Sequence, residues 1–186
     1  MSIDLVVTPL MQTDGPGPAF VRRNPIHDER GFFGRLYSAE QLAPFGWPGG
    51  VAHVNHSFTA KAGTVRGFHY QRDPYPEAKL VTCIRGAVLD IAIDARAGSA
   101  TRFSRATAEL SAENGGAMFV PEGFAHGFQA LTDDVELIYL HSSPYVADAQ
   151  GGFRPDDPAL GIAWPLPIAL TSAKDAAWPP IAEGVR

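Results

Sequence analysis

The chain has 186 residues, of which 45% are hydrophobic and 19% are charged, and its formal net charge is −5 at pH 7. This composition is typical of a globular protein, and residues 1–186 are expected to form a single domain. The negative charge and the scattered arginines argue against nucleic-acid binding, and no apolar run is long enough to cross a membrane. The N-terminus does not resemble a signal peptide and Cys83 has no second cysteine to pair with, so a cytoplasmic location is expected.

The first part of the chain is expected to hold short strands and one short helix. Residues 19–21 are predicted to be a short strand, and a segment rich in proline and glycine separates them from residues 3–7. Residues 28–33 predict a turn that leads into an aromatic strand. A helix is predicted over residues 38–42, because Ser38 is a favourable N-cap.

The middle of the chain is predicted to be β-structure. The expected strands, separated by Gly, Pro, Asn or Asp, cover residues 51–58, 65–70, 79–85, 87–93, 103–110, 117–120, 126–131 and 136–141. About eight short strands at this spacing predict a sandwich or barrel of the jelly-roll type. From residue 144 onward the many prolines predict an irregular tail with one short helix near residues 172–177.

One predicted strand carries two carboxylates. Asp90 and Asp94 alternate with Leu89, Ile91 and Ile93, so one face of the strand is expected to be apolar and the other to carry both acids. Such a pair can serve acid-base chemistry, but a structural role is preferred.

Two segments each place one histidine between aromatic residues and glycines beside a predicted strand. The first contains His69 and the second contains His126, and the two segments resemble the two halves of a cupin barrel. A metal-binding cupin needs a second imidazole two residues after the first, and here that position holds Gln71, which is a poor ligand. We therefore expect no metal, with His69 available as a base.

Further motifs accompany these histidines. They are Asp28-x-Arg30-Gly31-x-Phe33, Asn55-x-Ser57, Arg66-Gly67-x-His69-Tyr70-Gln71, Lys79-Leu80-Val81, Gly86-x-Val88-x-Asp90, Pro121-x-Gly123-Phe124-Ala125-His126-Gly127-Phe128, Tyr139 and Ser172-x-Lys174-Asp175. In order and spacing they resemble the dTDP-4-dehydrorhamnose 3,5-epimerase family, over about residues 20–180. The resemblance implies an all-β, cupin-like jelly-roll barrel with short peripheral helices and an irregular C-terminal tail.

The resemblance also implies a reaction. It is the epimerisation of a nucleotide-diphospho-4-keto-6-deoxyhexose at C3, C5 or both, through an enolate and without a cofactor, for deoxysugar biosynthesis. By similarity His69 is the base, Asp175 orients its ring, Lys79 offsets the enolate charge, and Tyr139 delivers a proton from the opposite face. Taken alone, Tyr139 in an apolar strand would more often be a core residue.

Substrate binding is assigned by the same resemblance. Arg30 and Arg66 match positions that bind the diphosphate, for which a guanidinium offers paired donors. The other expected substrate-binding residues are Phe33, Asn55, Gln71 and His126. The resemblance further implies a homodimer that exchanges N-terminal strands.

The chain departs from the family pattern at two positions near the expected nucleotide. Arg35 stands where a glutamate is usual, and His53 stands where a glutamine is usual. These changes make a different nucleotide or sugar an alternative. His27, His56 and His141 have no assigned partner and are expected to be surface or packing residues.

Three readings other than a 3,5-epimerase stay open at this point. The first is a mono-epimerase acting on a different nucleotide sugar, because the placement of the proton to be removed is not encoded in a motif. The second is a sugar-nucleotide-binding cupin without turnover, which the presence of both base and acid opposes. The third is a metal-dependent cupin, which Gln71 opposes.

Overall fold

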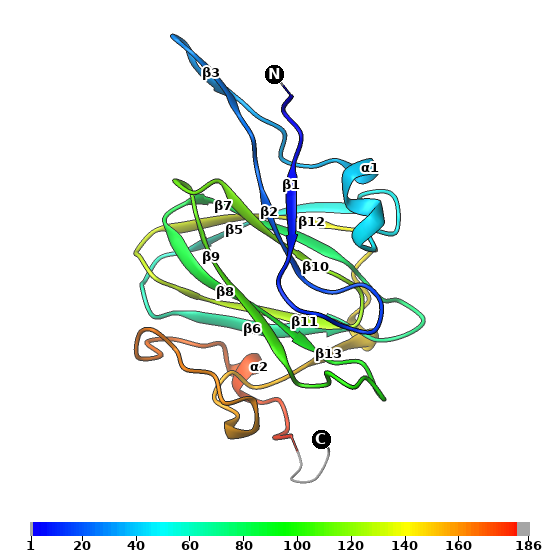
Figure 1. The fold of residues 1–186 in the computed structure, drawn as a ribbon. Helices are drawn as coiled ribbons and strands as arrows, with labels where there is room; N and C mark the ends of the chain where they lie inside the picture. Colours follow the sequence, from blue (N-terminus) through cyan, green and yellow to red (C-terminus); the bar gives the residue numbers. More distant parts are fainter. Residues whose placement is uncertain (1, 182–186) are drawn as a thin grey trace.

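The computed structural model describes residues 2–181, which fold into two β-sheets packed face to face (Figure 1). Residues 1 and 182–186 of the expected domain lie outside the described part. The six-stranded sheet contains, in spatial order, β1 (Val6–Pro9), β2 (Ala19–Arg22), β10 (Gly116–Val120), β7 (Lys79–Arg85), β12 (Val135–His141) and β5 (His53–Thr59). The five-stranded sheet contains β13 (Gln150–Gly152), β6 (Val65–Gln71), β11 (Phe124–Ala130), β8 (Ala87–Asp94) and β9 (Arg105–Ser111).

The remaining elements are short. They are the hairpin strands β3 (Ile26–Asp28) and β4 (Gly31–Phe33), the helices α1 (Ala39–Leu42) and α2 (Ala173–Ala176), and the 3₁₀ turns η1 (Ala43–Phe45), η2 (Ala147–Ala149) and η3 (Pro158–Leu160). The predicted all-β jelly roll with short peripheral helices is confirmed. No helix within residues 2–181 is long and apolar enough to span a membrane.

Local signals placed most elements correctly. The side chain of Ser38 accepts a hydrogen bond from the Gln41 N–H and so caps α1, as its residue type predicts. The predicted strand over residues 103–110 starts later, at Arg105. Phe103 has a φ of 64°, a left-handed conformation that an extended strand cannot contain.

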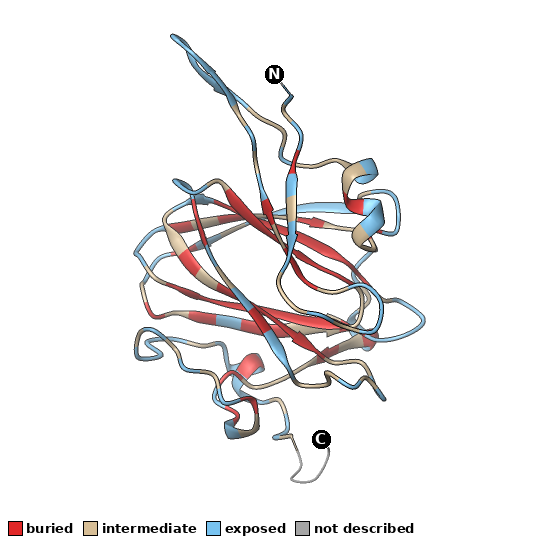
Figure 2. Cartoon of the chain, in the orientation of Figure 1, coloured by how far each residue is buried: buried red, intermediate tan, exposed pale blue. Residues whose placement is uncertain are grey.

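Three apolar clusters hold the sheets together. One lies between the sheets and includes Val81, Val88 and Phe128. A second packs α1 and the N-terminal segment on the outer face of the six-stranded sheet. In the third, Phe68 and Ile91 pack under the C-terminal segment, and Figure 2 shows the strands buried over much of their length while the β3–β4 hairpin is exposed.

Both faces of the sheet that contains β8 are covered by other parts of the chain, so the two carboxylates of β8 are buried. Ile91 and Ile93 pack on the outer face as expected, while Asp90 and Asp94 are both fully buried. Asp94 accepts hydrogen bonds from Arg96 and from the hydroxyls of neighbouring residues, which confirms a structural role. Asp90 contacts His126 instead and belongs to the site described below.

β6 and β11 approach each other closely, which sets the two motif histidines side by side. Gly67 has a φ of +118°, and a Cβ added there would lie 2.5 Å from the Cα of Gly127. Only glycine tolerates this contact without a shift of backbone. The register pairs His126 with His69 across the same two strands.

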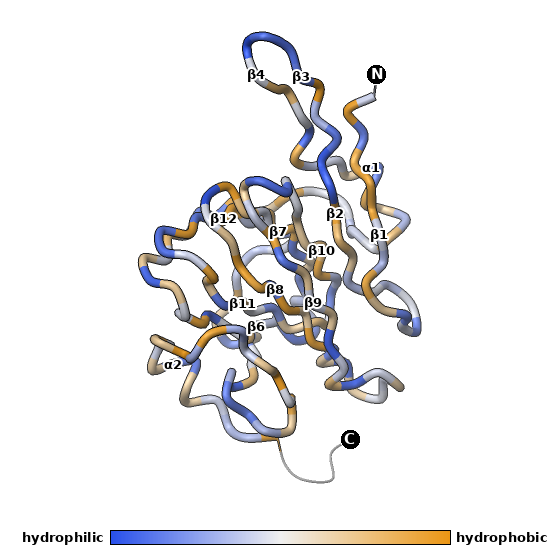
Figure 3. Tube along the Cα trace, turned by 60° about the vertical axis from the view of Figure 1, so that its left-hand side comes forward, coloured by the Kyte–Doolittle hydropathy of each residue, from blue (hydrophilic) through white to orange (hydrophobic). Residues whose placement is uncertain are grey.

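The C-terminal segment returns to the barrel and places α2 beside β6. Its backbone joins the start of β6 through hydrogen bonds from Ala169 N to Gly63 O and from Val65 N to Leu170 O, of 2.9 and 2.8 Å. The side chain of Ser172 caps α2 by accepting from the Asp175 N–H. The β3–β4 hairpin projects from the opposite end of the molecule, and its tip is hydrophilic (Figures 1 and 3).

Candidate active site

A cavity of about 650 Å³ opens between the two sheets. Strands β5 and β12 of the larger sheet and β6 and β11 of the smaller one supply its walls, and the C-terminal segment supplies its rim. The polar and charged side chains that line it include His53, Asn55, Ser57, Arg66, His69, Glu77, Lys79, His126, Tyr139, His141, Tyr145, Gln150, Lys174 and Asp175. Seven of the expected catalytic or substrate-binding residues therefore line one cavity: Asn55, Arg66, His69, Lys79, His126, Tyr139 and Asp175.

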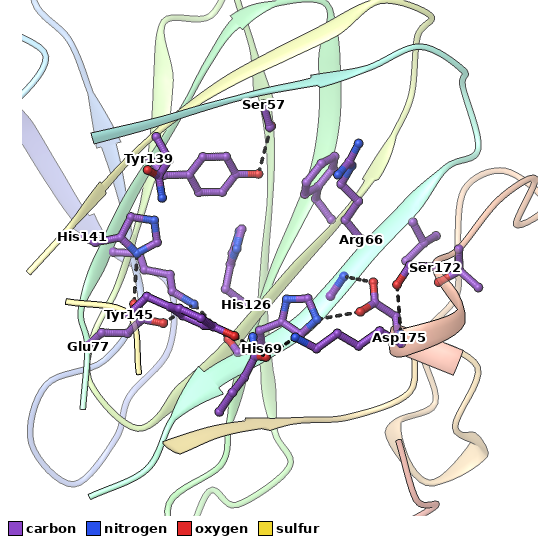
Figure 4. A pocket seen from close by; sticks show the side chains of 18 of the residues that line it. Ser57, Arg66, His69, Glu77, His126, Tyr139, His141, Tyr145, Ser172 and Asp175 are labelled. Atoms are coloured by element: carbon purple, nitrogen blue, oxygen red, sulfur yellow. Dashed lines mark hydrogen bonds and ion pairs between the residues drawn. The ribbon is translucent and has the colours of Figure 1, made fainter. Parts of the chain in front are cut away.

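His69 and Asp175 form a dyad, although they are 106 residues apart in sequence. The Nε2 atom of His69 lies 2.7 Å from Oδ1 of Asp175, and the Gly67 N–H donates to Oδ2 at 3.2 Å (Figure 4). Burial tends to raise the pKa of Asp175, but the hydrogen bonds from His69 and Gly67 outweigh it and lower the pKa. A carboxylate accepts only, so Nε2 of His69 donates and Nδ1 is left free to take a proton.

Tyr139 lies across the pocket from this dyad on β12 (Figure 4). Its hydroxyl accepts a hydrogen bond from Ser57 at 3.5 Å. Burial raises the pKa of Tyr139 well above that of a free tyrosine, against the effect of that hydrogen bond. The phenol therefore holds its proton at neutral pH and can act as an acid.

Lys79 and Glu77 form a buried ion pair at the start of β7. Their side chains are 7% and 8% exposed, and Nζ lies 2.9 Å from Oε1 of Glu77. Lys79 also donates to the backbone oxygen of His69 at 3.0 Å. The ammonium is thereby held beside the base, in a place where it can offset negative charge on a bound substrate.

A second histidine and carboxylate pair lies on the floor of the pocket. Nε2 of His126 is 2.9 Å from both carboxylate oxygens of Asp90, and neither side chain is more than 6% exposed. The ring of His126 also meets the edge of Tyr139 at a centroid distance of 6.0 Å. His126 thus contacts the predicted acid and stands opposite the predicted base in the sheet register.

The comparisons with known proteins decide the family. The family model described as dTDP-4-dehydrorhamnose 3,5-epimerase matches residues 12–183. A dTDP-4-dehydrorhamnose 3,5-epimerase from Sinorhizobium fredii is 40% identical over 164 residues, which are 88% of this chain and 84% of that protein. The chain belongs to the dTDP-4-dehydrorhamnose 3,5-epimerase family. It is therefore an isomerase.

Solved structures of epimerases have the same fold as this chain. The dTDP-6-deoxy-D-glucose-3,5-epimerase of Legionella pneumophila, in complex with dTDP-4-keto-L-rhamnose, matches with a TM-score of 0.84 at 32% identity, covering 94% of this chain and 92% of that one. A 3'-monoepimerase from Streptomyces bikiniensis, in complex with dTDP-quinovose, matches with a TM-score of 0.81 at 34% identity, covering 93% and 86%. The cupin-like barrel expected for this epimerase family is thus confirmed.

Arg66 fits the epimerase pocket, but Gln71 does not. The guanidinium of Arg66 donates to Thr59 Oγ1 and Phe58 O at 3.1 and 3.0 Å, and these contacts hold it on the pocket wall. Gln71 is 2% exposed, and its amide bonds to the backbone of Tyr75, Pro144 and Val146 instead of facing the cavity. The expectation that Gln71 contacts the substrate is therefore corrected to a role in fixing two loops.

Arg30 and Phe33 also lie away from the pocket of their own epimerase chain. Both belong to the β3–β4 hairpin, where the side chain of Arg30 is 84% exposed and pairs with Asp28, and Phe33 is 71% exposed. Of the two departures from the family pattern, His53 lines the cavity, whereas Arg35 bonds to Asp4 and Gln41 near the N-terminus. A single chain therefore holds an incomplete set of the expected binding residues.

Sequence reasoning missed several polar residues of this epimerase pocket, among them Ser57, Glu77 and His141, and it did not assign Asp90 as the partner of His126. Ser57 was part of a quoted motif, and the alternation along β8 had placed Asp90 on the face opposite the apolar one. His141 had been expected to be a surface or packing residue, but it lines the cavity and bonds to Glu77. Within residues 2–181, no group of three or more His, Cys, Asp or Glu side chains is arranged to hold a metal ion.

Proposed function

We propose that the chain converts dTDP-4-dehydro-6-deoxyglucose to dTDP-4-dehydrorhamnose by inverting C3 and C5, for deoxysugar biosynthesis. The observation that carries the proposal is one pocket that holds a carboxylate-bound imidazole, a partly buried phenol on the other side, and an ammonium beside the imidazole. These are a base, an acid and an electrostatic stabiliser, which is what epimerisation next to a ketone needs.

The proposed reaction starts with proton removal. Nδ1 of His69 takes the proton from the carbon next to the C4 ketone, and the C–H electron pair moves into the carbonyl to give an enolate. Asp175 stabilises the imidazolium that forms, and Lys79 offsets the charge on the enolate oxygen. Because the ketone accepts the electrons, the cycle requires neither a redox cofactor nor a metal.

Inversion requires that the proton return from the opposite face. The hydroxyl of Tyr139 gives its proton to the carbanion carbon, and the C4 carbonyl re-forms. Tyr139 then regains a proton from solvent and His69 releases one, so the net change is the configuration of one carbon. The same cycle at the second flanking carbon completes the double epimerisation.

Recognition of the substrate is assigned to the cations and amides around this centre. Arg66 offers paired donors to the diphosphate, and Asn55 and His126 contact the sugar or its phosphates. The chain is proposed to work as one domain in the cytoplasm. It would supply an activated deoxysugar to a later glycosyl transfer.

We further propose a homodimer in which each hairpin completes the pocket of the partner subunit. Arg30 and Phe33 lie on an exposed hairpin. The neighbouring side chains of Phe32 and Phe33 are both exposed there. On the edge strand β5, Val54 and Phe58 are 63% and 50% exposed, whereas Asn55 and Ser57 line the pocket. Exposed apolar side chains on an edge strand are typical of an interface.

Heterodimers of differently tagged subunits test the shared site. With Arg30→Ala on one subunit and His69→Ala on the other, one complete pocket forms, and about half of the wild-type activity is expected. With both substitutions on one subunit and a wild-type partner, both pockets are damaged and little activity is expected. The reverse ranking of the two heterodimers would contradict site sharing.

The proposed function is tested by proton NMR of dTDP-4-keto-6-deoxyglucose incubated in deuterated water with chelator-treated protein. We expect deuterium at both C3 and C5. Deuterium at only one carbon would favour the second candidate, a mono-epimerase, which is the activity named for the Streptomyces bikiniensis relative. Binding of the nucleotide sugar without exchange at either carbon would indicate a sugar-nucleotide-binding cupin.

A further inference from the structure

The wall of the pocket contains a carboxylate that the proposed mechanism does not use. Glu77 lies just before β7, with an 8% exposed side chain whose two oxygens have different partners. Oε1 is 2.9 Å from Nζ of Lys79, and Oε2 is 3.0 Å from Nδ1 of His141. Burial tends to raise the pKa of Glu77, but His141 and Lys79 outweigh it and lower the pKa to about 2, so the group is a carboxylate.

The hydrogen-bond partners of Lys79 leave one of its N–H donors unused within the described residues. An ammonium has three N–H donors, and two of them are directed at Glu77 and at the backbone oxygen of His69. The third points away from both of these acceptors. Because Lys79 lines the cavity, that donor is available to an oxygen atom of a bound substrate.

His141 connects Glu77 to the other side of the reaction. Its ring stacks on that of Tyr139 with a centroid distance of 6.1 Å and an interplanar angle of 20°. Since Glu77 is an acceptor, Nδ1 of His141 is the donor in their hydrogen bond. A single buried carboxylate thus links the cation beside the base to the ring packed on the acid.

Other titratable groups surround the pair formed by Glu77 and His141. Those that line the same cavity are His53 from β5, Arg66 and His69 from β6, Lys79 from β7, His126 from β11, Tyr139 from β12, Tyr145 from the loop after β12, and Lys174 and Asp175 from the C-terminal segment. Of these, Lys79 has a direct polar contact with Glu77.

We propose that Glu77 and His141 are positioning residues for the epimerisation. Glu77 fixes the direction of the Lys79 ammonium, and His141 joins Glu77 to the ring of Tyr139, on which it stacks. This inference rests on the proposed function.

The variant Glu77→Gln tests the first part, because it keeps the size of the side chain, removes the charge and replaces one of the two acceptor oxygens with an NH2 donor. We expect kcat to fall about tenfold at neutral pH, with KM within about threefold of the wild-type value. Asp156→Asn makes the same change on an exposed carboxylate paired with Arg154, and it should leave kcat and KM unchanged.

The variant His141→Phe tests the link between the two residues, because phenylalanine keeps a ring over Tyr139 but cannot donate to Glu77. We expect kcat to fall several-fold in the wild-type background and by less than about twofold in the Glu77→Gln background. Should either single variant fail to fold, as judged by thermal unfolding, the other one still decides the question.

Two results would overturn the inference. One is a folded Glu77→Gln or His141→Phe variant with the wild-type kcat, and the other is an equal effect of His141→Phe in both backgrounds. Failure of the proposed function gives a different result, since the wild-type protein would then exchange no deuterium into the 4-keto sugar, and the inference would fall with it.

Discussion

Replacing His69 with alanine is expected to stop deuterium entry at both C3 and C5 of the 4-keto sugar. A positioned general base contributes about 10² to 10⁴ in rate, and His69 has the Asp175 carboxylate on one ring nitrogen and the Lys79 ammonium on its backbone oxygen. The exchange rate in deuterated water, followed by proton NMR, is the measurement. The substrate should still bind, because Arg66 and Asn55 are untouched.

A companion variant separates the base from its orienting partner. Asp175→Asn keeps the side-chain shape but can donate to Nε2 of His69, which favours the tautomer with the proton on Nδ1, where the base must be free. We expect a large loss of exchange with little change in KM. Asp156→Asn is again the control. Wild-type exchange in the His69→Ala protein would show that another group removes the proton.

Replacing Tyr139 with phenylalanine is expected to separate exchange from inversion. The ring that contacts His126 and His141 is kept and only the hydroxyl is removed, so the pocket should retain its shape. His69 can still remove a proton and return a deuteron to the same face. Deuterium should therefore enter with retained configuration, while formation of the inverted product falls by about 10² or more.

Product stereochemistry read by NMR coupling constants, together with the deuterium content, checks this prediction. Tyr37→Phe is a matched control, because the hydroxyl of Tyr37 donates to the Gly49 backbone outside the pocket. Inversion at the wild-type rate in Tyr139→Phe would mean that Tyr139 is a packing residue, as an isolated tyrosine in an apolar strand usually is.

The roles of His69 and Tyr139 could be predicted from the sequence to different degrees. His69 stands out by its motif, and the strand that carries it is encoded locally by alternation and by flanking glycines. The role of Tyr139 came from resemblance, because nothing in Glu136 to Leu140 distinguishes it from a core residue. Its burial beside Ser57 is a property of the packed barrel.

Other side chains could be assigned only after the chain was folded. Gln71 is directed into two loops, and Arg30 and Phe33 are carried away from the barrel by a hairpin. Glu77 and His141 are 64 residues apart and gave no local signal, yet they share a hydrogen bond in the pocket wall. A motif records the type and spacing of residues, whereas the direction of a side chain depends on strands paired from distant segments.

Local sequence was enough to predict the strand pattern, the capped helices and the jelly-roll class, because strand alternation, turn residues and N-caps act over a few neighbouring residues. Which side chains meet in the pocket depends on the packing of the whole chain. It brought Asp175 to His69 through the C-terminal segment, placed Asp90 behind His126, and connected Glu77 to both Lys79 and His141. These contacts form between elements far apart in the chain, and only the packing of two sheets around one cavity fixes their geometry.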